Sequence, residues 1–154
     1  MKTTQLGIEL GSRHLRVTAP SKEEFLKIKN MIAFDEDDKV KAIGDEAFDM
    51  YEKQPYSVRV IKPMEHGVIS DYTNMRYLLG TVLDQYFKRV HKPKLWIAVP
   101  VDITNVEKRA FDDLAWEAAG KVKDIKLVEK PVLAAMGSGI DVEAPCGNMM
   151  IDIG

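Results

Sequence analysis

The stretch Leu6-Gly7-Ile8-Glu9-Leu10-Gly11-Ser12 sets the pattern of the fold. Its apolar residues make a strand-sized run, and the glycine and serine that end it predict a tight turn. Residues 15–19 form a second apolar run that stops at a proline, and residues 25–29 alternate apolar and charged side chains. Alternation with a period of two is typical of a half-buried strand. Three strands joined by short turns predict an antiparallel meander.

The middle of the chain alternates predicted helices and strands. Residues 44–51 predict a short helix, and residues 58–61 predict a strand. Asp71 can cap a long helix in which apolar residues recur every three or four positions until the chain reaches Pro93. The apolar run 95–99 then predicts an inner strand of a sheet.

Local signals mark the remaining elements. Thr104 and Glu107 form a capping box for a helix that Gly120 is expected to end. Residues 125–128 predict another strand, and Pro131 suits the first turn of a small-residue helix. A last apolar run, residues 149–153, predicts a final strand. An antiparallel meander extended by parallel strands with crossover helices is a mixed α/β fold.

Composition excludes several classes of protein. The chain has 22 Lys and Arg against 24 Asp and Glu, and this near balance argues against a general nucleic-acid binder. One cysteine, Cys146, excludes an internal disulfide framework and fits a reducing compartment. No apolar stretch approaches the roughly 20 residues that cross a bilayer, and the N-terminus lacks a signal-like apolar region. We therefore expect a cytoplasmic protein.

Two strand–acid–glycine elements are the main candidates for chemistry. One contains Glu9, Gly11 and Ser12, and the other contains Asp152 and Gly154. A carboxylate beside a glycine turn can hold a phosphate or a hydrated magnesium ion, and two such carboxylates could share one metal. The plain alternative is a hairpin turn with a solvated acid, and spacing alone favours it. The histidines lack the spacing of a zinc site.

Several motifs together resemble the MreB-like bacterial actins, within the superfamily of actin, sugar kinases and heat-shock chaperones. The most specific runs from Pro63 to Tyr72, with Met64, Gly67 and Asp71 in family positions. The matching stretches follow in family order nearly from end to end: residues 7–12, 43–47, 61–72, 99–100, 103–110, 129–135 and 148–154.

The resemblance implies a cell-shape-determining cytoskeletal protein that binds ATP with magnesium and polymerises with itself or another actin-like chain. It implies an actin-like, ribonuclease-H-like subdomain at residues 1–30 and 71–147, and a small inserted subdomain at 31–70. Residues 148–154 would be the first strand of a second domain, so this chain would be only the N-terminal half. The implied nucleotide contacts are Gly11, Ser12, Arg13, His14 and Gly154, and the implied water-mediated magnesium ligands are Glu9 and Asp152.

Departures from the family pattern qualify these implications. Glu9 replaces an aspartate, which would shift a metal shell by about a methylene. Lys130 replaces the glutamate that positions the attacking water, and an ammonium cannot accept a proton, so no catalytic residue is assigned and hydrolysis is expected to be weak or absent. Lys29-Asn30-Met31 replaces the usual Glu-Pro-Ser. The loop 89–94 is basic with one valine, so association with the inner membrane would be peripheral, electrostatic and weak.

Three functional hypotheses remain open on the sequence. The chain is a truncated or split filament subunit with residual nucleotide contacts, a non-catalytic domain that pairs with or caps another actin-like chain, or a non-functional remnant. The second is motivated by the predicted strand 149–153, because an unpaired apolar strand invites pairing with another chain.

Overall fold

A five-stranded mixed sheet organises the protein. The computed structural model describes residues 4–20, 25–53, 56–87 and 92–151. The strand order is β10-β9-β1-β2-β3, and the predicted meander of three antiparallel strands, extended by two parallel ones, is confirmed. These strands are β1 (Gln5–Leu10), β2 (His14–Thr18), β3 (Leu26–Lys29), β9 (Lys94–Val99) and β10 (Asp124–Glu129).

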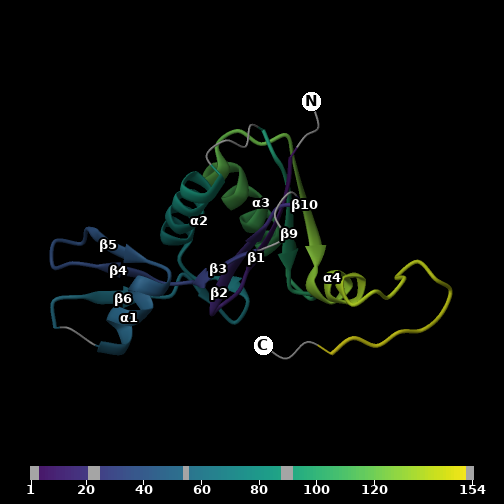
Figure 1. Ribbon diagram of the computed structural model, residues 1–154, viewed down its shortest axis with the longest axis horizontal. Coiled ribbons are helices and arrows are strands. Elements are labelled where there is room, and N and C mark those ends of the chain that lie inside the picture. Colours follow the sequence, from purple (N-terminus) through teal and green to yellow (C-terminus); the bar gives the residue numbers. More distant parts are fainter. Residues whose placement is uncertain (1–3, 21–24, 54–55, 88–91, 152–154) are drawn as a thin grey trace.

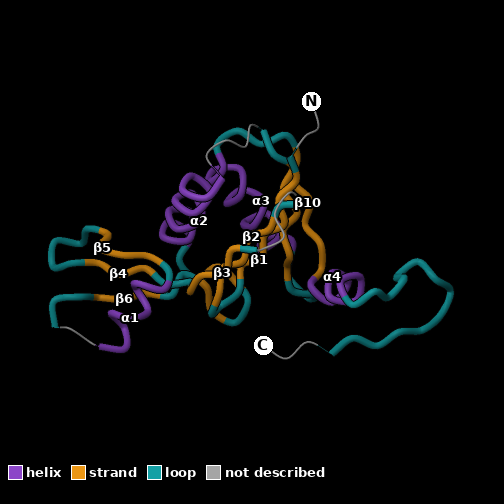
Figure 2. The backbone as a smooth tube through the Cα atoms, in the orientation of Figure 1, coloured by secondary structure: helices purple, strands orange, loops and turns teal. Residues whose placement is uncertain are grey.

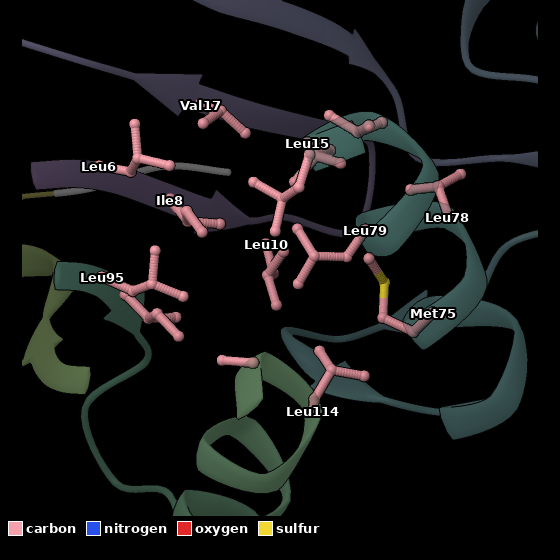
Figure 3. Packing of buried hydrophobic residues seen from close by; sticks show 14 of the residues in the cluster. Leu6, Ile8, Leu10, Leu15, Val17, Met75, Leu78, Leu79, Leu95 and Leu114 are labelled. Atoms are coloured by element: carbon pink, nitrogen blue, oxygen red, sulfur yellow. The ribbon is translucent and has the colours of Figure 1, made fainter. Parts of the chain in front are cut away.

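Two helices cover one face of this sheet. Helices α2 (Tyr72–Phe87) and α3 (Asn105–Ala119) pack against each other and lie on the same side of it (Figure 1). Alternate residues of β1 point toward them, and Figure 3 shows their side chains meeting those of α2 and α3. The buried cluster includes Leu6, Ile8, Leu10, Leu15, Val17, Met75, Leu78, Leu79, Val82, Leu95, Ile97, Phe111 and Leu114.

The predicted helix caps are present. The Asn74 backbone amide donates to Asp71 Oδ1 at 3.1 Å, just ahead of α2. Thr104 and Glu107 form the reciprocal capping box of α3, and Gly120 ends that helix with a φ of 67°. These polar groups satisfy amides and carbonyls that a helix end leaves unpaired. These caps fix the start of α2 and both ends of α3, the two helices that pack on the sheet.

Residues between β3 and α2 form a small antiparallel sheet and a hairpin. The sheet order is β5-β4-β6, with helix α1 (Asp45–Lys53) packed against it at one end of the molecule (Figure 1). Its strands are β4 (Ile32–Phe34), β5 (Val40–Ile43) and β6 (Arg59–Ile61), and the hairpin is β7 (Met64–Glu65) with β8 (Val68–Ile69). Strands β4, β5, β7 and β8 were not predicted, because runs of two to four residues carry too little periodicity.

Helix α4 (Lys130–Gly137) follows β10 directly, and Pro131 lies in its first turn as predicted. The chain beyond it runs as a loop (Figure 2). The predicted strand at 149–153 is wrong for Met149, Met150 and Ile151, since no strand among the described residues pairs with them. Asp152 and Ile153 lie outside the described residues. In the part of the chain that the structure covers, no helix is both long enough and apolar enough to cross a membrane.

Candidate functional site

The turn between β1 and β2 is closed by a glycine that cannot be replaced without strain. The Gly11 amide donates to the His14 carbonyl oxygen at 3.0 Å. A Cβ atom at position 11 would lie 2.9 Å from that same oxygen, which is closer than real side chains come. Ser12 Oγ accepts a hydrogen bond from the Gly67 amide at 3.0 Å. The turn is therefore tied to the β7–β8 hairpin.

Asn30 holds the turn between β1 and β2 through two hydrogen bonds. It is fully buried, its Nδ2 donates to the Gly11 carbonyl oxygen at 2.8 Å, and its backbone amide donates to the Arg13 carbonyl oxygen at 3.0 Å. Its Oδ1 has no hydrogen-bond partner among the described residues. Sequence reasoning noted residues 29–31 only as a departure and gave Asn30 no role. A single asparagine after a strand carries no signal that separates a buried clamp from a surface turn.

Glu9 lies between two cations. Arg16 Nη1 is 2.6 Å from Glu9 Oε2, and Lys130 Nζ is 3.5 Å from Glu9 Oε1. Glu9 and Arg16 are directly opposite each other in the β1–β2 register, so their side chains share one face of the sheet. Lys130 reaches the same carboxylate from the first position of α4. Arg16 was not predicted, because its position opposite Glu9 depends on the register of the hairpin.

The Glu9 carboxylate is poorly suited to direct coordination of magnesium. Both of its oxygens are already paired with cations, and one carboxylate with two cations leaves an excess positive charge. Magnesium gives up its water reluctantly, so the contact through water that the family resemblance implies for Glu9 stays a prediction. Within the described ranges, no group of three or more His, Cys, Asp and Glu could hold a metal ion. Asp152, the other predicted ligand, lies outside them.

The exposed face of β2 and β3 is basic. Arg16 is opposite Lys27, and His14 is opposite Lys29. Partial burial, followed by the charges of nearby lysines and arginines, lowers the pKa of His14 below its ordinary value of 6.5. The imidazole is therefore neutral near pH 7. Arg16 and Lys27 carry like charges directly opposite each other in the sheet and repel, so a bound anion would stabilise this face.

A hollow of about 600 Å³ opens on the sheet face opposite α2 and α3. The cluster of Glu9, Arg16 and Lys130 lines it together with apolar side chains, including Phe25 and Trp96. These two aromatic residues are 58% and 40% exposed. A charged cluster beside exposed apolar surface is a combination found in binding sites.

The structure brings together part of the predicted site. Gly11, Ser12, Arg13 and His14 form one turn, and Glu9 lies two residues before it. Lys130 is brought to Glu9 by α4. Asp152 and Gly154 lie outside the described residues, so their part in the site stays a prediction.

Comparison with known proteins identifies the family. Residues 3–154 match the model of the MreB/Mbl protein family. The chain belongs to the MreB/Mbl family. It is 32% identical over its whole length to the cell shape-determining protein Mbl of Bacillus subtilis strain 168, and 30% identical to MreB of Escherichia coli K12. It covers 46% of each, and so spans about half the length of the curated relatives that it matches.

Solved structures confirm the predicted actin-like fold. MreB5 of Spiroplasma citri bound to ADP superposes with a TM-score of 0.82 at 23% identity, covering 94% of this chain and 43% of that one. The MamK double helical filament gives a TM-score of 0.71 at 21% identity, with 90% and 44% covered. At these identities the likeness concerns the fold alone.

Proposed function

We propose that this chain is a cell-shape-determining, actin-like cytoskeletal protein whose β1–β2 turn contacts the phosphates of a nucleotide. The observation that carries the proposal is the fixed turn of Gly11, Ser12, Arg13 and His14, held by Asn30 and by the β7–β8 hairpin. Backbone amides in a glycine turn, with cations beside them, suit an anion. The ADP bound to the Spiroplasma citri relative supports a nucleotide as that anion.

Hydrolysis by this chain is proposed to be weak or absent. Lys130 stands where the family resemblance places a proton-accepting glutamate, and its ammonium is paired with Glu9. Glu129, one residue earlier, is exposed and belongs to the last position of β10. A protonated lysine cannot activate water as a general base. We therefore propose that the chain binds the nucleotide without hydrolysing it.

A titration with ADP tests the nucleotide contact. The backbone amide signals of residues 11–14 should shift in NMR spectra as ADP is added to the native chain. Gly11→Ala should abolish the shifts, because the added Cβ meets the His14 carbonyl oxygen. Gly147→Ala is the matched control, since a Cβ there has nothing within 4 Å. Unchanged signals at residues 11–14 in the native chain would reject the proposal.

Pairing with a second actin-like chain, or with another copy of this one, is a second candidate function. The exposed aromatic residues Phe25 and Trp96, which line the hollow, favour it, because exposed apolar surface often marks a protein interaction site. The MamK relative assembles into a double helical filament. Sedimentation of the native chain should show association that Trp96→Glu removes, whereas Trp116→Glu, a change of an equally exposed tryptophan on α3, should leave it intact. A native chain that stays monomeric at high concentration would contradict this function.

A location in the cytoplasm, with weak electrostatic attachment to the inner membrane, completes the proposal. Its basis is the basic loop 89–94, of which residues 92–94 are described. Sedimentation with anionic vesicles at low and high salt would test it: binding should be present only at low salt.

A further inference from the structure

We propose that the ammonium of Lys130 takes the place of a divalent cation beside Glu9, so that this domain contacts phosphate without magnesium. The metal part of this inference stands on the ion pairs alone, and the phosphate part rests on the proposed function. The starting observation is that Lys130 Nζ and Arg16 Nη1 each pair with a different oxygen of the same carboxylate.

Lys130 is held in place by the local fold. It is the first residue of α4, and Pro131 behind it restricts the backbone at the helix start. Its side chain is only 20% exposed, whereas the side chain of Lys126, on β10, is 59% exposed. The positive end of a helix dipole disfavours a lysine at this position, and the Glu9 carboxylate offsets that cost. The pair is therefore a partly buried contact between β1 of the sheet and the start of α4.

The charge balance works against a metal. A divalent ion at Glu9 would join two fixed cations around one carboxylate, and the repulsion between like charges is strong where water is partly excluded. To coordinate the carboxylate directly, the metal would have to displace Lys130 or Arg16 from one of its oxygens. No other cluster among the described residues offers a replacement set of ligands.

The same charges suit a phosphate. Lysine binds phosphate as a compact point charge, and arginine donates in a planar fork that matches phosphate oxygens. Lys130 and Arg16 lie at the end of the hollow where Glu9 adjoins the Gly11 turn, since Glu9 Oε1 would be 3.9 Å from a Cβ at Gly11. Glu9 acts as a positioning residue that holds both cations beside the turn.

Binding of Mn²⁺, measured by electron paramagnetic resonance, tests the metal part without any nucleotide. The native chain should show no saturable Mn²⁺ site, and Lys130→Glu should create one, because it removes a cation that pairs with Glu9 and adds a carboxylate. Lys126→Glu is the matched control, because it makes the same charge change at a lysine that pairs with Asp124 and leaves Glu9 untouched. Native binding that Glu9→Gln removes would overturn the inference, and so would a Lys130→Glu variant that gains nothing over the control.

Titration with ADP in excess EDTA and in excess magnesium tests the phosphate part. The affinity should be the same in both buffers, and Lys130→Ala should weaken it by about tenfold, the loss expected for one charged contact. Binding that requires magnesium would overturn the inference and leave the proposed function standing. Absence of binding in both buffers would reject the proposed function, and the manganese measurement would still decide whether Lys130 excludes the metal.

Discussion

Asn30 donates from its buried side-chain amide to the carbonyl oxygen of Gly11, 19 residues earlier in the chain, at 2.8 Å. This bond joins the residue after β3 to the turn between β1 and β2, and the Asn30 backbone amide adds a second bond to Arg13. The shape of the turn between β1 and β2 thus depends on a residue outside it. A hydrogen bond in a buried site costs most when one partner is removed and the other is left unpaired.

Asn30→Ala should therefore lower the free energy of unfolding by about 1 kcal/mol, because the half-buried Gly11 carbonyl oxygen loses its hydrogen-bond donor. Urea unfolding measures this loss. Asn148→Ala is the control, because Asn148 is exposed and its only side-chain bonds described here are long ones to Cys146. Equal stability of the two variants would show that Asn30 does not hold the turn.

Thr104→Ala should destabilise the protein by about 1 kcal/mol, because the capping box loses the acceptor that the Glu107 amide uses. Thr73→Ala, at an exposed position of α2, provides the comparison in thermal or urea unfolding. If both variants lost the same stability, the cap would contribute nothing measurable.

Glu107 adds a dependence on pH. Hydrogen bonds from the Thr104 side chain and backbone lower the pKa of the Glu107 carboxyl below its ordinary value. A carboxyl with a depressed pKa in the folded state stabilises the protein above its unfolded pKa, and this contribution is lost as the pH falls through the folded pKa. The stability difference between the native chain and Glu107→Gln should therefore shrink as the solution is acidified below about pH 4.3. A difference that does not change with pH would contradict the capping account.

The His14 side chain should have a pKa below the ordinary value for histidine. Partial burial, with Lys27 and Lys29 next in importance, lowers the pKa of this imidazole. Because the unfolded chain then binds a proton more readily than the native chain, stability should be full above about pH 6.5 and fall as the pH drops from there toward the folded pKa. NMR titration of the His14 ring protons gives the pKa directly, and a value at or above 6.5 would contradict the basic surroundings described for β2 and β3.

Substitutions in the segment after α4 should affect stability far less than substitutions in the main core. Ile151 is 72% exposed and Leu114 is fully buried in the main core. Leu114→Ala should cost about 2–5 kcal/mol, and Ile151→Ala should leave the free energy of unfolding within about 0.5 kcal/mol of the native value. A large loss for Ile151→Ala would indicate that residues 149–151 pack as the strand that their apolar sequence predicted.

The success of the sequence reasoning follows the strength of the local signals. Helix α2, with Asp71 before it, and α3, with Thr104 and Glu107 at its start, could be predicted because caps and apolar spacing act within a few residues. The mixed sheet, a meander extended by parallel strands, could be predicted from the alternation of strands and crossover helices, whereas the order of its strands was not predicted. The prediction failed at residues 149–151, since an apolar run forms a strand only when a partner strand pairs with it.

The candidate site was predictable only in part for the same physical reason. The Gly11 turn and its neighbours are contiguous, so their meeting needs no tertiary information. The pairing of Glu9 with Arg16 and Lys130 depends on the β1–β2 register and on where α4 begins. The clamp by Asn30 depends on how β3 returns beside the turn. Contacts of this kind are absent from local patterns, and here they place Glu9 at the centre of an ion-pair cluster.

Nucleotide binding in the absence of a divalent cation tests the central claim most directly. ADP is titrated into the native chain in excess EDTA while the backbone amides of residues 11–14 are followed by NMR. The account predicts saturable shifts of these amides, with the same affinity when magnesium is then restored. The account would be contradicted if the amide signals shifted only after magnesium was added, or if signals elsewhere shifted while those of residues 11–14 did not.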